Sequence, residues 1–199
     1  MALLKPNAGA ALRRGWARRW ASWSVVIALF GATGAAARAE AAISAENQVK
    51  AVFLFNFTQF VKWPARTFAD AQAPIVIGVL GEDPFGPYLD GVVQNEKIGE
   101  RPIVVRRYRR LEDLAECQLL FISRSESARL EQICEQLRNW SVLTVGDSEN
   151  FNRQGGMVRL ATESGKIQLR INVTAAKTAE LTLSSKLLAH AVIVAPGKN

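Results

Sequence analysis

The chain has 199 residues, with 25 Lys and Arg against 18 Asp and Glu, a formal net charge of +7 and a hydrophobic fraction of 49%. This composition excludes disordered and fibrous proteins, and the length fits one domain of ordinary size. The single His and two Cys exclude most zinc sites and leave one candidate base for a His-dependent triad. The positive charge alone would suggest a partner that carries phosphates.

The first 39 residues have the pattern of a secretory signal peptide. Basic residues begin the segment, an apolar stretch covers 20–30, and Ala37-Arg38-Ala39 matches an A-x-A cleavage site. An uncleaved membrane anchor is the alternative, although the stretch is short for a spanning helix. Removing 1–39 takes away six basic and no acidic residues, which leaves a net charge of +1. We therefore expect an exported, periplasmic domain over 40–199 that does not bind nucleic acid, because such binding needs a surplus of cations.

The first expected element of this domain is a helix over 45–63, ended by Pro64. Its apolar residues recur at helical spacing and form one stripe that should pack on a sheet: Val49, Val52, Phe53, Phe57, Phe60 and Val61. Asn56 falls inside the stripe, where it needs a hydrogen-bond partner such as a neighbouring loop. Phe55 projects from the other side, so either an adjacent element or a partner protein must cover it.

Strands and helices alternate after this helix. The expected strands are 74–81, 103–108, 118–123 and 142–145, followed by a hairpin of 157–161 and 166–172. The expected helices are 84–93, capped by Asp83, then 126–140, 175–180 and a last helix from Ser184 or Ser185. This order predicts a single three-layer α/β domain. It has a mostly parallel sheet, helices on both faces and an antiparallel hairpin near the C-terminus.

The strand-to-helix turn at 81–86 lies where open α/β sheets usually bind ligands. Its glycine spacing is not that of a dinucleotide site, and Glu82 and Asp83 would repel a phosphate there. A small-molecule sensor is nevertheless an alternative function, with a pocket at Glu82 and Asp83 or beside Arg170.

Catalytic and metal sites are not indicated elsewhere in the sequence. His190 is more simply a packed or surface residue than a base, and neighbouring carboxylates point apart. Asp147 and Glu149 flank a turn, but two carboxylates alone do not specify a metal. We therefore expect no enzyme activity, no cofactor and no metal.

Cys117 and Cys134 would meet an oxidising compartment after export. Cys117 precedes a strand, and Cys134 lies late in the helix that returns antiparallel to it, so both fall toward one end of the same layer. We expect a disulfide between them, at a borderline Cα separation. The alternative is two buried free thiols.

Segments over nearly the whole exported domain resemble the YfiR-like family of periplasmic regulators. They include VKAVFLFNFTQFVKWP (49–64), IGVLGEDPFGPYLDGV (77–92), CQLLFIS (117–123), FNRQGGMVRL (151–160) and LTLSSKLL (181–188). The resemblance implies a non-catalytic protein that represses an inner-membrane diguanylate cyclase by binding its periplasmic part, which lowers cyclic-di-GMP signalling and biofilm formation. It also implies an outer-membrane lipoprotein that relieves the repression, and a homodimer. Redox-dependent disulfides occur in the family, but its best-known member has two bridges and this chain has only two cysteines.

A small exported domain without a catalytic constellation suits a protein that acts through an interface. The residues that we expect to border this interface are Phe55, Lys62, Trp63, Gly155, Gly156 and Lys186. The substitution Phe55→Ala should then weaken binding of the membrane partner and hardly change the melting temperature. A large loss of stability would instead place Phe55 in the core.

Overall fold

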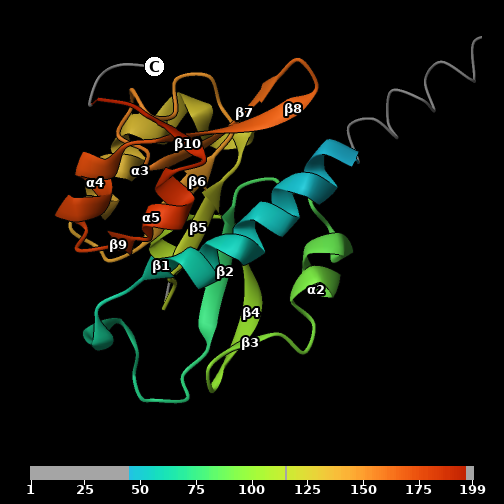
Figure 1. Cartoon of the computed structure of the whole chain (residues 1–199), viewed down its shortest axis with the longest axis vertical. Helices are drawn as coiled ribbons and strands as arrows, with labels where there is room; N and C mark the ends of the chain where they lie inside the picture. Colours follow the sequence, from blue (N-terminus) through green and yellow to red (C-terminus); the bar gives the residue numbers. More distant parts are fainter. Residues whose placement is uncertain (1–44, 115, 196–199) are drawn as a thin grey trace, which may run out of the picture. The chain divides into compact units, whose positions relative to one another are not determined.

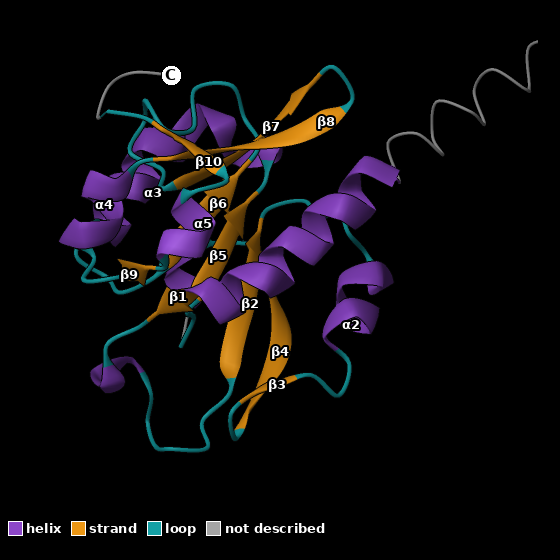
Figure 2. Cartoon of the chain, viewed as in Figure 1, coloured by secondary structure: helices purple, strands orange, loops and turns teal. Residues whose placement is uncertain are grey.

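The computed structural model describes residues 45–114 and 116–195. Its centre is an eight-stranded sheet with helices on both faces (Figures 1 and 2). In sheet order the strands are β10 (Ala191–Ile193), β8 (Lys166–Ile171), β7 (Val158–Glu163), β6 (Leu143–Gly146), β5 (Leu119–Ile122), β2 (Ile75–Leu80), β4 (Arg101–Tyr108) and β3 (Lys97–Ile98). Neighbouring strands are parallel except for β7 with β8 and β3 with β4. The expected three-layer α/β fold is therefore confirmed.

The N-terminal helix spans 45–60 and crosses one face of the sheet (Figure 1). It ends earlier than expected, because Val61–Lys62 form strand β1, which pairs antiparallel with β9 (Thr182–Leu183). The backbone N–H of Ser184 also donates to the carbonyl of Phe60 at 2.9 Å. The prediction that the helix continues to Trp63 is thus wrong, since this pairing takes the chain out of the helix before Pro64.

Three further helices share the face of the N-terminal helix and help to bury the larger core: α2 (Pro87–Val93), α4 (Val173–Thr178) and α5 (Ser185–Leu188). The opposite face carries α3 (Leu130–Leu137), which follows the 3-10 helix η3 (Arg124–Arg129). Two shorter 3-10 helices are η1 (Ala65–Thr67) and η2 (Leu111–Asp113). None of the helices in the described ranges is long and apolar enough to cross a membrane. The expected signal peptide, 1–39, lies outside these ranges.

Helix α2 begins at Pro87, three residues after the expected start at Pro84. The Asp83 carboxylate accepts from the backbone N–H of Phe85 at 2.7 Å, so it closes a turn and does not cap a helix. Gly86 then takes the N-cap position with φ of 50°, a conformation that glycine adopts without strain.

The C-terminal strand β10 was not expected from the sequence. It pairs in parallel with β8, placing Ala191 opposite Leu169 and Ile193 opposite Ile171. The chain reaches this position through α5, so the antiparallel hairpin of β7 and β8 is internal to the sheet and β10 forms its edge.

The two cysteines are free and buried in the structure, so the expected Cys117–Cys134 disulfide is not formed there. Cys117 packs beside Gly78, where an added Cβ would lie 2.8 Å from its Sγ. Cys134, on α3, instead contacts the turn at Gly155, where an added Cβ would lie 3.2 Å from the Cβ of Cys134. The two cysteines therefore pack against different segments, Cys117 against β2 and Cys134 against the turn before β7. Burial raises the pKa of each to about 12, which leaves both protonated and unreactive at neutral pH.

Candidate functional site

An apolar groove with a volume of about 660 Å³ lies between the N-terminal helix and α5. Its floor is the face of β8, and its walls come from the two helices and the residues that follow α5. We call this feature the apolar groove. Its lining residues are Phe53, Asn56, Phe57, Phe60, Ile167, Leu169, Lys186, Leu187, Ala189 and His190. Six of these ten carry large apolar side chains, so the groove offers a mainly hydrophobic contact surface.

The N-terminal helix can form one wall of this groove because it has apolar side chains on two faces. The face toward the sheet buries Ala51, Leu54 and Phe57 at 1% exposure or less. A second face carries part of the predicted stripe, and here Val49 and Val52 are 49% and 40% exposed. The prediction that the whole stripe packs on the sheet is therefore wrong, because helical periodicity does not identify which of two apolar faces is covered.

Aromatic side chains of this helix shape one wall of the groove. The rings of Phe53 and Phe57 lie with their centroids 6.2 Å apart and tilted by 34°. Phe57 is buried, whereas Phe53 and Phe60 are half-buried and pack against the core from its edge. The wall therefore continues the hydrophobic core outward to the surface.

The floor and the second wall follow from local sequence patterns. In β8, Ile167 and Leu169 alternate with polar residues, so both project to the face of the N-terminal helix. Helix α5 has only four residues, and the Ser184 hydroxyl caps it by accepting from the N–H of Leu187 at 3.2 Å. This cap directs Leu187 into the core and leaves Lys186 exposed at the rim.

Three polar side chains lie on the rim of the groove: Asn56, Lys186 and His190. Within the described ranges Lys186 has no ion-pair partner, and the side chains of Asn56 and His190 have no hydrogen-bond partner. The hydrogen bond expected from Asn56 to a neighbouring loop is thus not formed. The lining contains one lysine and no carboxylate, so its charge is positive.

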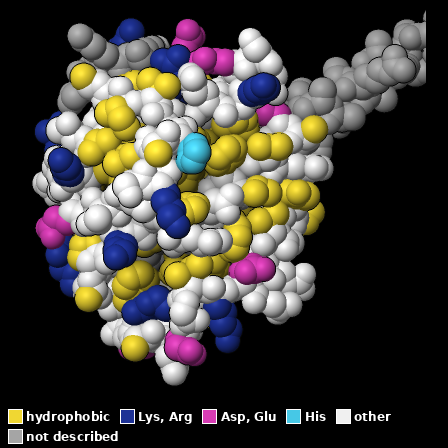
Figure 3. Space-filling model, viewed as in Figure 1, with side chains coloured by type: hydrophobic (Ala, Val, Ile, Leu, Met, Phe, Trp, Pro, Cys, Tyr) yellow, Lys and Arg dark blue, Asp and Glu magenta, His cyan; other side chains and the backbone are white. Residues whose placement is uncertain are grey.

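Figure 3 shows this face of the molecule. Hydrophobic side chains gather on both sides of the histidine, the chain's only one, with Lys and Arg side chains nearby. Exposed apolar surface of this kind, bordered by polar groups, is typical of sites that bind other molecules.

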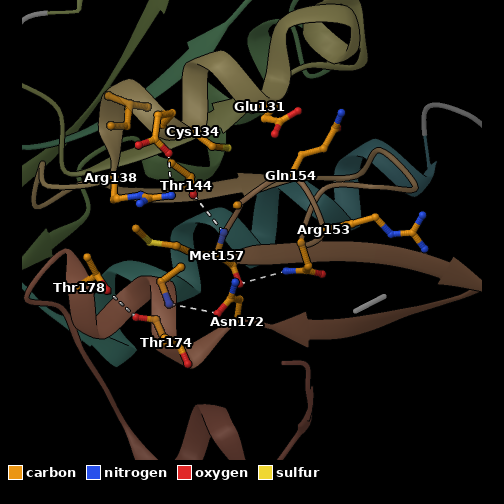
Figure 4. A pocket seen from close by; sticks show the side chains of 15 residues that line it. Glu131, Cys134, Arg138, Thr144, Arg153, Gln154, Met157, Asn172, Thr174 and Thr178 are labelled. Atoms are coloured by element: carbon orange, nitrogen blue, oxygen red, sulfur yellow. Dashed lines mark hydrogen bonds and ion pairs between the residues drawn. The ribbon is translucent and has the colours of Figure 1, made fainter. Parts of the chain in front are cut away.

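A second, more polar cavity of about 380 Å³ lies beside α3 and α4 (Figure 4). We call it the polar cavity. Glu131 and Cys134 come from α3, Arg138 from its C-cap, Thr174 and Thr178 from α4, and further residues from the turn before β7. Figure 4 shows these side chains arranged around the space between the two helices and the turn.

The wall of the polar cavity is held by hydrogen bonds to side chains. Thr144 accepts from the N–H of Met157 at 3.1 Å, and Asn172 caps α4 by accepting from the N–H of Ala175 at 3.0 Å. Asn152, which is 1% exposed, donates to the carbonyls of Gly156 and Met157. These groups maintain the turn, so the cavity has a rigid polar wall.

The structure places only one of the expected interface residues, Lys186, in the apolar groove. Lys62 is exposed in β1, outside the lining. Trp63 is half-buried and its indole N–H donates to the carbonyl of Gln118 at 2.8 Å, which ties the loop after β1 to the start of β5. Phe55 is half-buried and packs against the core. It therefore does not project freely from the helix as its position in the sequence suggested.

Gly155 and Gly156 lie elsewhere, in the turn beside the polar cavity. Gly155 is exposed and lines the cavity with φ of 97°. Gly156 is buried, and an added Cβ there would lie 2.2 Å from the ring of Phe151. The structure thus separates these glycines from Lys186, and it gives Gly156 a packing role.

The expected ligand-pocket residues are distributed over two further places and line neither cavity. The Asp83 carboxylate lies 2.8 Å from Nε of Arg107, which also pairs with Asp90 and holds the pKa of Asp90 below its ordinary value. Arg170 pairs with Glu163 at 2.7 Å on the hairpin of β7 and β8. The backbone N–H of Glu82 donates to the Ser125 hydroxyl at 3.0 Å.

Metal-binding side chains do not cluster in the described ranges, where no group of three or more His, Cys, Asp or Glu could hold an ion. The apolar groove therefore provides contact area and one cation, and the polar cavity provides hydrogen-bonding groups. Both arrangements are suited to binding another molecule.

The family model of YfiR/HmsC-like proteins matches residues 47–192. The chain belongs to the YfiR/HmsC-like family. The match begins in the N-terminal helix and ends in β10, so it contains every residue that lines the apolar groove and the polar cavity. A comparison with curated proteins finds no match. Membership in the YfiR/HmsC-like family confirms the resemblance that the sequence segments indicated, and it indicates a regulatory protein.

Proposed function

We propose that the protein is a periplasmic, non-catalytic regulator that binds the periplasmic part of an inner-membrane diguanylate cyclase and represses it. Its action lowers cyclic-di-GMP signalling and biofilm formation, and an outer-membrane lipoprotein relieves it. Family membership over 47–192 supports the regulatory role. The observation that carries a mechanism by contact is the apolar groove, since hydrophobic surface walled by two helices serves binding.

The groove differs from the rest of the surface because some of its lining residues also belong to the hydrophobic core. Leu169 in its floor and Leu187 in its wall are 5% and 6% exposed and belong to the main hydrophobic cluster. A partner side chain that enters the groove would therefore contact a rigid, well-packed surface. Contacts of this kind provide most of the free energy in protein interfaces.

The test is binding between the protein, purified from the periplasmic fraction, and the purified periplasmic domain of an inner-membrane diguanylate cyclase from the same organism. Val52→Asp places a charge on the exposed apolar face of the N-terminal helix, next in sequence to the groove residue Phe53, and should weaken this binding at least about tenfold, because the charge loses hydration in the complex. Cells that carry the variant should contain more cyclic-di-GMP.

The matched control is Trp140→Asp, since Trp140 is 48% exposed but lies far along the chain, outside the groove lining. This variant should bind the cyclase domain as the unmodified protein does. Recovery of the protein from the cytoplasmic fraction alone, or absence of any binding to the cyclase domain, would contradict the proposed function. Equal weakening by both variants would contradict the assignment of the groove.

A small-molecule sensor is the second candidate function, and the polar cavity is the observation that favours it. Its volume of about 380 Å³ lies within the range of ligand sites, and its lining includes carboxylates, guanidinium groups and hydroxyls. Amino acids and nucleotides should be tested as ligands by thermal shift, because a ligand that binds the folded state raises its melting temperature. A shift lost in Arg153→Ala but kept in Lys186→Ala would locate such a ligand in the polar cavity.

A further inference from the structure

The layer of helices on the groove side of the sheet is incomplete over β8. The N-terminal helix packs along one side of this strand and α5 along the other, and the apolar groove is the space between them. Ile167 remains half-buried there, and the wall continues to the exposed Val49 and Val52. An element that filled this space would bury apolar surface on three sides.

We propose that the groove receives an amphipathic helix of the protein partner, whose apolar face completes the layer over β8 and whose carboxylate pairs with Lys186. The inference rests on the proposed function to the extent that a protein partner is assumed. It adds the secondary structure and the charge of the segment that binds.

The backbone pairing of the floor favours a helix over an extended segment. β8 is paired with β7 along its whole length and with β10 at Leu169–Ile171, so only its first three residues, 166–168, have an unpaired edge. Peptides that bind as an added strand need a free sheet edge, and the edge here is only three residues long and lies in the plane of the sheet, not over its apolar face. A helix satisfies its own backbone hydrogen bonds and can lie on an apolar sheet face, as the neighbouring helices do here.

The charge of the rim favours an acidic side chain on that helix. Lys186 is exposed, has no ion-pair partner among the described residues, and is the only charged side chain in the lining. His190 lies four positions further along the chain, and Asn56 faces the groove from the opposite wall. A carboxylate beside Lys186 would be paired there, whereas a lysine would meet like charge and lose affinity.

The test uses two synthetic helical peptides with the same leucine stripe, one flanked by Glu and the other by Lys, and the full exported protein. Fluorescence anisotropy should show that the acidic peptide binds about fivefold more tightly than the basic peptide, as expected for one partly exposed charge pair. Lys186→Glu should reverse this order. Lys62→Glu is the matched control, since Lys62 is exposed but outside the lining, and it should keep the original order.

A third peptide has the acidic composition with two central prolines, which prevent a helix. It should bind at least about tenfold more weakly than the helical acidic peptide, if the helix is what the groove recognises. Equal affinity of the acidic and basic peptides, an order that Lys186→Glu leaves unchanged, or tight binding of the proline peptide would overturn the inference. The cyclase-domain measurement tests the proposed function separately, because it does not depend on which segment binds.

Discussion

Lys50 Nζ lies 2.5 Å from Asp147 Oδ2, although 97 residues separate them in the sequence. Lys50 is on the N-terminal helix and Asp147 follows β6, and their side chains are 2% and 9% exposed. Glu46 contacts the same Nζ, and Arg124 contacts the other oxygen of Asp147. This network fixes the start of the helix, and hence one wall of the apolar groove, to the carboxyl end of the central strands.

Loss of the Asp147 charge should destabilise the fold strongly. Asp147→Asn leaves Lys50 buried with only Glu46 as partner, and breaking a buried pair in this way costs about 3 kcal/mol. Lys50→Met should cost less, because Asp147 keeps Arg124 and lies nearer to the surface. Urea unfolding measures both free energies. Asp113→Asn is the control, since it removes an exposed ion pair with Arg110 and should leave the urea midpoint of unfolding unchanged. A larger loss for Lys50→Met than for Asp147→Asn would contradict this account.

The same network predicts how stability depends on acid. The hydrogen bond from Lys50 holds the pKa of Glu46 below its ordinary value of 4.5. A carboxyl whose folded-state pKa is lowered contributes stability above the unfolded pKa, and this contribution is lost as pH falls through the lowered value. Unfolding free energies measured from neutral pH to below 4.5 should therefore fall less steeply in Glu46→Gln. An equal slope in both proteins would show that Glu46 is not coupled to folding.

The buried thiols should resist alkylation while the protein is folded. Burial raises the pKa of Cys117 and Cys134 to about 12, so thiolate is scarce and access is blocked. Iodoacetamide should modify both residues only after unfolding, which mass spectrometry detects. Because these folded-state pKa values are raised, stability should also decline as pH rises from about 9 toward 12. A Cys117–Cys134 peptide in a non-reducing map would contradict the free thiols.

The turn before β7 should not tolerate a side chain at Gly156. An added Cβ would lie 2.2 Å from the ring of Phe151, which is fully buried, so Gly156→Ala should cost about 3 kcal/mol by overpacking. Gly91→Ala is the control, since nothing lies within 4 Å of the new methyl group and the residue is inside α2. That variant should gain about 0.5 kcal/mol from helix propensity. Thermal unfolding that ranks the two variants in the opposite order would refute this packing.

Periodicity and turn chemistry predicted the fold class, the central strands and the start of the final helix. Five apolar residues and a glycine in IVIGVL indicated a buried strand, and β2 has no exposed residue. The last helix, expected to start at Ser184 or Ser185, begins at Ser185 with Ser184 as its N-cap. These sequence patterns depend on neighbouring residues alone. The structure agrees with them where no contact with a distant segment changes the local conformation.

Features that depend on distant contacts were not predictable in the same way. The helix end before Val61 results from pairing with Leu183, and the start of α2 results from a turn closed by Asp83. Of the expected interface residues, only Lys186 lies in the apolar groove. The signal that could have located the groove was the width of the first helix's apolar stripe, which exceeds what one sheet face can cover.

Strand β1 pairs with β9, so Val61 lies opposite Leu183, 122 positions later in the chain. The groove is therefore walled by the first described helix and the last, and it exists only after the two ends of the domain have met. A chain that stops before Leu183 would carry every other strand pair except that of β10, yet it would have no second wall. Truncation before Leu183 should therefore remove the groove while most strand pairs of the large sheet remain.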